Sequence, residues 1–208
     1  MIAIVDYGRG NLGSVEKAFE RVGMDAVVTQ DAKAVDDADA VVLPGDGAFH
    51  DAMSNLDRLG LTPSLRRALD GRRPFLGICL GYQLLFSRSE EFGEGRGLDV
   101  LSGVVRRFAA GRKVPHMGWN RVEHGQRLRL FEGIPDGAHF YFVHSYYPEM
   151  AVNGVATAWC DYGVRFAAAI ERGVTFATQF HPEKSQRWGL RLLENFAALV
   201  RAATAARA

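Results

Sequence analysis

The sequence predicts an α/β fold with a mainly parallel central sheet and helices on both of its faces. Short apolar runs rich in valine, as in residues 25–29 and 40–44, have the composition of strands that are buried on both faces. Amphipathic stretches with helical spacing lie between these runs. This alternation is typical of parallel strands that are connected by helical crossovers.

The first half of the chain supplies the elements of that sheet. Strands are predicted within residues 1–7, 25–29, 40–44 and 73–78. Helices are predicted within residues 14–23, 48–61, 62–71 and 80–89. In the first of these helices, Val15, Ala18 and Phe19 recur at helical spacing and Gly23 ends the pattern.

The sequence changes in character after about residue 86. A polar, glycine-rich loop at 89–97 precedes strand-like runs within residues 100–108, 138–148, 154–163, 166–173 and 174–182. These runs predict an additional antiparallel or mixed layer of strands, packed against the first half. A last helix begins near residue 186, with Leu192, Phe196 and Leu199 on one face. Because no linker or repeat separates the halves, residues 1–208 are expected to form a single domain.

Composition excludes several classes of protein. The 208 residues are 48% hydrophobic and 24% charged, with a formal net charge of +1, so no electrostatic field favours nucleic acid or a membrane surface. No apolar run approaches the length of a membrane span. Cys79 and Cys160 form neither a disulfide framework nor a C-x-x-C metal motif, and we expect no metal site. The first residues resemble a strand rather than a signal peptide, and a cytoplasmic location is expected.

A glycine motif near the start permits a second interpretation. Gly8, Gly10 and Gly13 form G-x-G-x-x-G between a predicted strand and a predicted helix, and Asp31 lies near the offset of a ribose-binding acid. The motif alone is compatible with a dinucleotide-binding Rossmann protein. It is equally compatible with a tight turn that needs glycine backbone angles.

The stretch "GICLGYQLLF", residues 77–86, places a cysteine between two glycines, after a strand and before helical periodicity. A lone cysteine is usually a small buried hydrophobe. The pattern Gly77-x-Cys79-x-Gly81, however, has the form of a nucleophile elbow, in which a strained turn exposes the nucleophile. Backbone N–H groups after Cys79 favour a thiolate, and the N–H of Leu80 is placed to donate to an oxyanion.

A partner for this nucleophile is found late in the chain. His181 ends an apolar run, Pro182 biases it to extended geometry, and Glu183 lies two residues further on. In an extended segment, residues two apart point to the same side, so Glu183 is expected to orient the imidazole of His181. An isolated His-Pro-Glu is more often an exposed turn, but its combination with the cysteine elbow predicts a catalytic triad.

The elbow and "QFHPEKS" resemble the class I, triad-type glutamine amidotransferases. The stretches "IVDYGRGNLGSV", "LPGDGAF", "PHMGWN" and "YFVHSYY" narrow the resemblance to the glutaminase subunits of imidazole glycerol phosphate synthases, which serve histidine biosynthesis. The resemblance runs from residue 2 to about residue 196. It implies that the glycine motif is the family's "DYGxGN" turn, and it implies no cofactor.

The resemblance assigns Cys79 as nucleophile, His181 as general base and then acid, and Glu183 as the group that orients His181. It implies that glutamine is hydrolysed to glutamate and ammonia through a glutamyl thioester. Oxyanion donors are expected from the backbone of Leu80 and of Asp46 and Gly47. Asp46 departs from the family, which usually has valine there, and we expect its carboxylate to point outward. Tyr82 replaces a common methionine and is expected to affect only packing.

The resemblance also implies binding residues and a partner. Glutamine is expected to be held by Gln83 and by the backbone of His144, Ser145 and Tyr146. The partner is a (β/α)8-barrel synthase subunit that forms a heterodimer with the glutaminase and consumes its ammonia on a phosphoribosyl aminoimidazole nucleotide. Residues expected at or near this interface are Asn11, Trp119, Asn120 and Lys184. The remaining alternatives are a catalytically silent binding subunit or another class I glutaminase.

Overall fold

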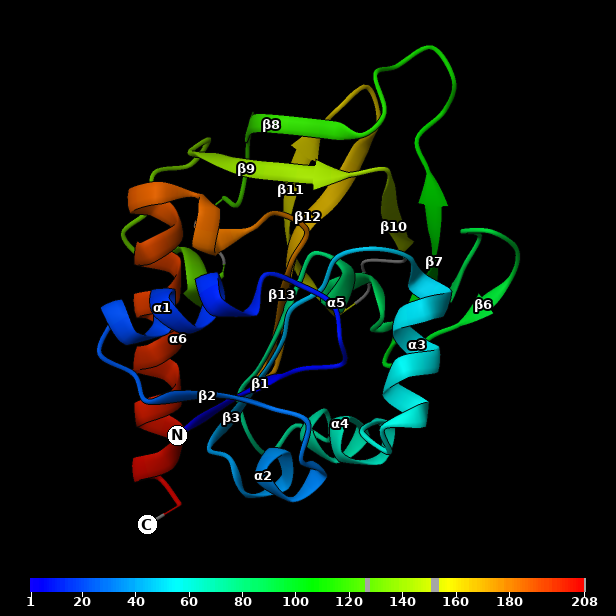
Figure 1. The fold of residues 1–208 in the computed structure, drawn as a ribbon. Helices are drawn as coiled ribbons and strands as arrows, with labels where there is room; N and C mark the ends of the chain where they lie inside the picture. Colours follow the sequence, from blue (N-terminus) through cyan, green and yellow to red (C-terminus); the bar gives the residue numbers. More distant parts are fainter. Residues whose placement is uncertain (126–127, 151–153, 208) are drawn as a thin grey trace.

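The computed structural model describes residues 1–125, 128–150 and 154–207. Its central sheet has seven strands in the order β11-β12-β13-β4-β3-β1-β2 (Figure 1). Five neighbouring strands are parallel, and β11 and β12 extend the sheet in antiparallel fashion at one edge. The strands are β1 (Ile2–Val5), β2 (Ala26–Thr29), β3 (Ala40–Leu43), β4 (Phe75–Ile78), β11 (Ala156–Asp161), β12 (Arg165–Arg172) and β13 (Thr175–Thr178).

Helices cover both faces of this sheet, as the sequence predicts. One face is covered by α1 (Leu12–Arg21) and α6 (Gln186–Ala205), and the other by α2 (Ala32–Asp37), α3 (Phe49–Arg58) and α4 (Thr62–Ala68) (Figure 1). The alternation of side chains along β1 explains the two cores. Ile2 and Ile4 pack with the α1–α6 side, whereas Ala3 and Val5 pack with the α3–α4 side. All four are buried, so the run is apolar throughout.

The predicted additional layer consists of two smaller sheets. A four-stranded mixed sheet has the order β10-β7-β5-β6, and β8 pairs antiparallel with β9. These strands are β5 (Phe86–Ser89), β6 (Gly95–Arg96), β7 (Leu101–Arg107), β8 (His116–Arg121), β9 (His139–His144) and β10 (Tyr146–Met150). The short helices η1 (Arg129–Phe131) and η2 (Pro182–Lys184) complete the fold.

The helix predicted over residues 80–89 is much shorter in the structure. The helix α5 spans only Leu80–Gln83, and the chain then enters strand β5, which pairs with β7. Every residue from Leu80 to Phe86 is buried, so no polar face remains to mark where the helix ends. Tertiary pairing with β7 overrides the local helical pattern.

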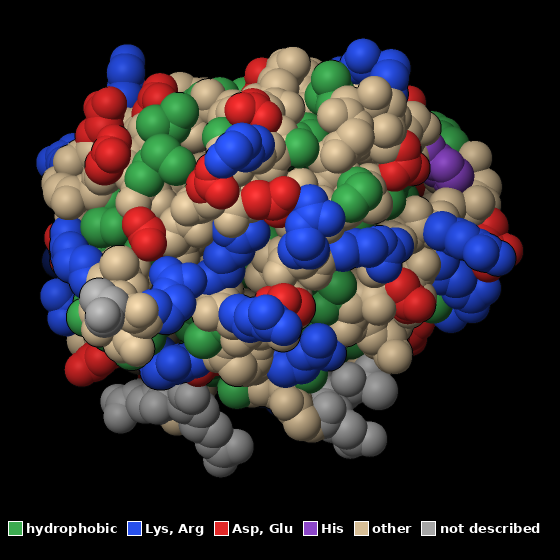
Figure 2. Space-filling model, turned by 90° about the horizontal axis from the view of Figure 1, so that it is seen from below, with side chains coloured by type: hydrophobic (Ala, Val, Ile, Leu, Met, Phe, Trp, Pro, Cys, Tyr) green, Lys and Arg blue, Asp and Glu red, His purple; other side chains and the backbone are tan. Residues whose placement is uncertain are grey.

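The surface is consistent with the balanced charge. Figure 2 shows Lys and Arg side chains interleaved with Asp and Glu on the face seen from below. Ion pairs such as Arg67–Asp36 and Arg207–Asp39 join charges of opposite sign at the surface. Across the described ranges, no helix is both long enough and apolar enough to cross a membrane.

Candidate active site

Cys79 lies in a strained turn directly after β4. Its backbone has φ 54° and ψ −107°, a conformation that costs of order 1–3 kcal/mol for a residue with a side chain. Two glycines make the turn possible: a Cβ added to Gly81 would lie 1.8 Å from the Leu43 carbonyl oxygen, and one added to Gly77 would lie 2.9 Å from the Gly81 oxygen. The strained strand-to-helix turn predicted at Cys79 is therefore formed. Because α5 is a single turn, its dipole stabilises a thiolate less than the sequence suggested.

His181 lies beside this turn because β13 and β4 are parallel neighbours. The backbone N–H of Cys79 donates to Thr178 at 2.7 Å, and His181 follows β13 by three residues. The Nδ1–H of His181 donates to Glu183 Oε1 at 2.8 Å, and both side chains are buried. Since a carboxylate only accepts, Nδ1 carries a proton, and Nε2 is the nitrogen left to exchange a proton with other groups.

The backbone from His181 to Glu183 differs from the continuous extended segment that was expected. His181 is extended, but Glu183 lies in the 3₁₀ turn η2 rather than in a continuing strand. The charges that surround His181 are nevertheless those expected for the predicted triad. Burial opposes protonation, but the Cys79 sulfur and the Glu183 carboxylate outweigh it and raise the pKa of His181 to about 10. A thiolate and an imidazolium therefore favour each other in this site.

Cys79 and His181 both line a cavity of about 420 Å³. The cavity brings together all of the residues predicted for oxyanion and glutamine binding, and it is also lined by Lys184. Its lining residues are Asp46, Gly47, Cys79, Leu80, Gln83, Glu91, Pro115, Val143, His144, Ser145, Tyr146, His181 and Lys184. No cluster of three or more His, Cys, Asp or Glu among the described residues could hold a metal ion.

The Pro-Gly-Asp-Gly segment, residues 44–47, follows β3 and borders the cavity. Asp46 is exposed, and its Oδ1 accepts a hydrogen bond from the Gly10 N–H at 3.0 Å. The carboxylate is thus engaged with the N-terminal turn. Gly47 has φ +85°, and a Cβ at Gly45 would lie 2.0 Å from the Tyr7 hydroxyl oxygen. The segment is therefore wedged between that buried tyrosine and the turn.

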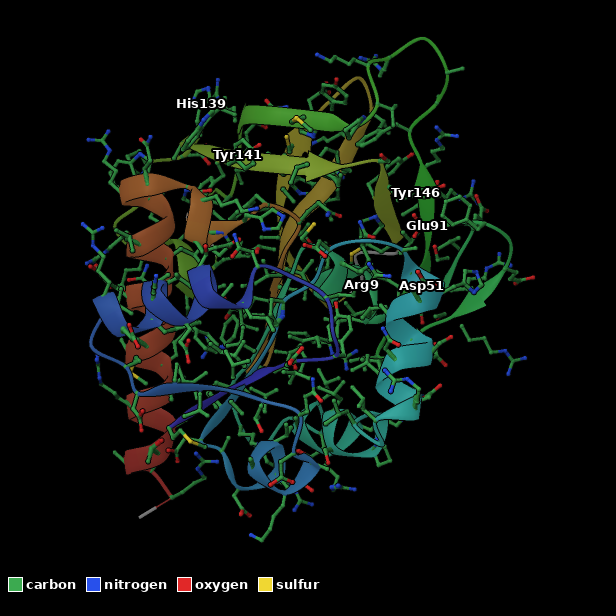
Figure 3. The ribbon with its side chains drawn as sticks, viewed as in Figure 1. Arg9, Asp51, Glu91, His139, Tyr141 and Tyr146 are labelled. Carbon is green, nitrogen blue, oxygen red and sulfur yellow. The ribbon has the colours of Figure 1, made fainter. Side chains whose placement is uncertain are left out.

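The N-terminal glycine turn packs against the same segment. A Cβ on Gly10 would approach the Cα of Gly45 at 3.5 Å. Arg9 extends from this turn toward α3 and forms an ion pair with Asp51 at 3.3 Å (Figure 3). Asp31, considered as a ribose ligand, instead caps α2 by accepting from the Lys33 N–H. The glycine motif and Asp31, which together allowed the dinucleotide-binding interpretation, therefore both have structural explanations.

A chain of hydrogen bonds runs behind the cavity from Tyr146. The carbonyl of Tyr146 accepts from Gln83 Nε2 at 2.9 Å and from His144 Nδ1 at 2.8 Å. His144 Nε2 lies 3.0 Å from His116 Nδ1. His116 Nε2 lies 3.1 Å from Asn120 Nδ2. Burial lowers the pKa of His116 to about 4 and, together with neighbouring histidines, lowers the pKa of His144 to about 3, so both rings are neutral.

Two residues were missed in the sequence, one that lines the cavity and one that lies behind Cys79. Glu91 is buried and its Oε2 accepts from the Phe49 N–H at 2.7 Å, which caps α3 (Figure 3). It lies in a polar loop between other glutamates, so no pattern distinguishes it. Gln179 is fully buried, and its Nε2 lies 3.7 Å from the Cys79 sulfur. It lies two residues before His181 of the His-Pro-Glu motif but carries no signal of its own.

The residues predicted at the partner interface separate into two groups. Trp119 is 46% exposed on β8 beside the exposed Met117. The centroid of its ring lies 6.1 Å from that of Tyr141 on β9; Tyr141 is labelled in Figure 3. Asn11 is exposed at the start of α1. Asn120 instead turns its amide inward, toward His116 and the Asp161 carbonyl.

The remaining residues singled out in the sequence have packing roles. Tyr82 is fully buried and stacks edge-on against Phe86. Cys160 is buried, and burial with the nearby Asp161 and Glu123 charges raises its pKa to about 12. This thiol is therefore protonated and unreactive at neutral pH.

Comparison with known proteins identifies the family of the chain. The family "Glutamine amidotransferase class-I" matches residues 3–200. The imidazole glycerol phosphate synthase subunit HisH of Moorella thermoacetica is 54% identical over 96% of this chain and 95% of its own length. The HisH subunit of Methanothermobacter thermautotrophicus is 52% identical over 97% of this chain and all of its own length.

Solved structures show the same fold at lower identity. A crystal structure of a glutamine amidotransferase superimposes with a TM-score of 0.76 at 21% identity, covering 97% of this chain and 100% of that chain. A glutamine amidotransferase from Thermotoga maritima gives a TM-score of 0.65 at 19% identity, over 97% of this chain and 89% of that chain. The chain belongs to the class I glutamine amidotransferase family of enzymes, and within it to the family of the HisH subunits.

Proposed function

We propose that the chain is the glutaminase subunit of an imidazole glycerol phosphate synthase, acting in the cytoplasm. The observation that carries the proposal is that Cys79 and His181, with Glu183 hydrogen-bonded to His181, meet at one cavity whose other walls include the predicted glutamine-binding residues. Relatives about half identical over nearly the whole chain support the choice of this enzyme among class I glutaminases.

In the proposed reaction, the Cys79 thiolate attacks the side-chain amide carbon of glutamine. The negative charge that develops on the amide oxygen is stabilised by the backbone N–H of Leu80 and by one from Asp46 or Gly47. Imidazolium Nε2–H of His181 protonates the departing nitrogen, and ammonia leaves a glutamyl thioester. His181, again neutral, removes a proton from water, which attacks the thioester and releases glutamate.

The rest of the cavity supports recognition of an amino acid. Glutamine carries an α-ammonium group, and the buried carboxylate of Glu91 offers it an opposite charge in a site of low dielectric. The main chain at Ser145 and Tyr146 lines the same cavity and supplies polar groups for the remainder of the substrate. Gln83 lines the cavity from α5, and its Nε2 already donates to the Tyr146 carbonyl oxygen.

The ammonia is proposed to pass to a (β/α)8-barrel subunit within a heterodimer. Ammonia in water is mostly protonated at neutral pH and is then no nucleophile, so internal transfer preserves its reactivity. The exposed side chains of Met117 and Trp119 give the outer face of β8 the aromatic and methionine character that is enriched at interfaces. Asn11 and Lys184 are proposed to lie at or near the same contact, with Asn120 supporting it from within.

The proposal is tested by glutamate release from glutamine in three states: the chain alone, with a barrel subunit, and with that subunit plus its aminoimidazole nucleotide. Activity mainly in the last state is expected. Cys79→Ala should abolish it without loss of complex formation, whereas the matched Cys160→Ala should retain it. Release that never responds to the nucleotide would indicate another class I glutaminase, and release by Cys79→Ala would refute the assigned nucleophile.

A further inference from the structure

The side-chain amide of Gln179 contacts the sulfur of Cys79, and the mechanism above gives it no role. Gln179 is fully buried, two residues before His181, and its backbone N–H donates to the Ala168 carbonyl at 2.8 Å. Its Nε2 lies 3.7 Å from Cys79 Sγ. On another side the sulfur lies 3.9 Å from the Val143 carbonyl oxygen, which can accept from a thiol but repels a thiolate. A donor to the sulfur therefore matters most once the thiol is deprotonated.

The hydrogen-bonding pattern fixes which end of the Gln179 amide faces the sulfur. The Tyr146 carbonyl can only accept, so the atom of Gln83 that lies 2.9 Å from it is the NH₂ nitrogen. The second hydrogen of that NH₂ points to Gln179 at 3.1 Å, which must therefore present its oxygen. The Gln179 NH₂ group is left to face Cys79. A backbone atom thus determines the orientation of both amides.

The Tyr146 carbonyl also fixes the direction of the hydrogen bonds on its other side, toward His144. It accepts the Nδ1–H of His144, so His144 Nε2 must accept from His116 Nδ1–H. His116 Nε2 then accepts from Asn120, whose NH₂ also donates to the Asp161 carbonyl at 3.0 Å. An unbroken series of hydrogen bonds therefore connects β8, which carries the exposed Trp119, with the catalytic sulfur.

We propose that Gln179 is a further catalytic residue, whose amide N–H stabilises the Cys79 thiolate while Gln83 and the Tyr146 carbonyl hold it in orientation. This inference rests on the proposed function, because it concerns the same nucleophile. A hydrogen bond to the charged form of a group favours that form over the neutral one. Bonds to ionised acceptors are about twice as strong as neutral ones.

The test measures alkylation of Cys79 by iodoacetamide as a function of pH, with the modified site located by mass spectrometry. The thiolate displaces iodide, so the rate follows the thiolate fraction, and the protonated Cys160 serves as an internal reference. Gln179→Met keeps the size and removes the donor. We expect the pH of half-maximal rate to rise by about one unit, a tenfold loss of thiolate below the midpoint.

A second variant separates this role from a structural one. Gln179→Glu keeps an acceptor for Gln83 Nε2 but places a carboxylate beside the sulfur, so it should raise the midpoint further than Gln179→Met. A purely structural role predicts the opposite order, because the glutamate preserves more of the network. Gln30→Met, which breaks an exposed hydrogen bond to Asp6, is the matched control and should leave the midpoint unchanged.

All variants keep the other charged and titratable groups around the sulfur, so differences between them isolate Gln179. These groups are Tyr7, Asp46, Glu91, His144, His181, Glu183 and Lys184. If either buried variant fails to fold, NMR of the wild-type protein provides the same test. The Nε2 resonance of Gln179 should then shift with pH at the alkylation midpoint.

The proposal would be overturned by equal alkylation midpoints in the wild type and both variants. It would also be overturned by a Gln179 Nε2 resonance that does not shift when Cys79 is deprotonated. Failure of the proposed function would look different. In that case the wild type would release no glutamate with its partner and nucleotide, although the midpoints of the variants could still be ordered as expected.

Discussion

The neutral pair His116 and His144 should make the fold sensitive to mild acid. Both rings are at most 6% exposed, and burial lowers the pKa of His116 to about 4 and that of His144 to about 3 from an ordinary value of 6.5. As the pH falls below 6.5, the unfolded chain binds protons at these positions and the folded chain does not. Their contribution to stability is therefore present above pH 6.5 and is lost as the pH falls toward 4.

The size of the effect follows from linkage. At pH 5 each histidine lies about 1.5 units below its unfolded pKa, which corresponds to about 2 kcal/mol, so the pair should cost about 4 kcal/mol relative to pH 7.5. Small domains are stable by roughly 5–15 kcal/mol, so this loss is a large fraction of the total. The raised pKa of His181 acts in the opposite direction: between pH 7.5 and 6.5 only the unfolded ring gains a proton, which adds about 1 kcal/mol of stability, and below pH 6.5 the contribution of His181 is constant.

Urea unfolding of the free chain at pH 7.5 and 5.0 measures the loss directly. His116→Gln removes one titrating group, so its loss between the two pH values should be smaller than in the wild type by about 2 kcal/mol. The ring contacts of His116 with Phe142 and Tyr162 also disappear, so only the pH dependence is compared and not the absolute stability. His139→Gln, an exposed change on the neighbouring strand β9, should keep the wild-type pH dependence. Equal losses in the wild type and His116→Gln would refute the reasoning.

Three further predictions concern the site and its surface. Glu91→Gln keeps an acceptor for the α3 amide but removes the charge, so the KM for glutamine should rise about tenfold with little change in kcat; steady-state kinetics of the complex would contradict this if kcat alone fell. Gly81→Ala forces a methyl group against the Leu43 carbonyl and should lower the free energy of unfolding by about 3 kcal/mol or more, as measured with urea; an unchanged midpoint would argue against the tight turn. Trp119→Ala should weaken partner binding by about 2 kcal/mol in calorimetry without changing thermal stability, and unchanged affinity would exclude this face from the interface.

The fold and the catalytic elbow were accessible from the sequence because their signals are local. Gly77 and Gly81 flank Cys79 at the spacing that a strained turn requires, and the structure shows the steric reason for each glycine. The alternation of apolar strands and helices likewise reflects burial on both faces of one sheet. The expected turn at Gly8 and Gly10 also has a local cause, since both have positive φ.

Other features could not be predicted, because their causes are distant in the chain. The helix expected over residues 80–89 ends at Gln83 because β5 pairs with β7, which is a tertiary contact. The contact of Gln179 with Cys79 joins residues 100 positions apart, and the strand before it is buried throughout, so alternation gives no clue to its direction. Glu91 reaches the cavity because its carboxylate caps α3, a role that composition does not reveal.

The register between β4 and β13 also has a consequence for how the protein is made. Strand β13, and His181 after it, are synthesised about 100 residues after Cys79. At roughly 5–20 residues per second, the ribosome needs about 5–20 s to cover that distance. During this interval the nascent chain contains the Cys79 thiol but lacks His181, the proposed base, and the strand that pairs with β4 beside the elbow. In the proposed mechanism, glutamine hydrolysis therefore requires that the last central strand has first inserted between β4 and β12.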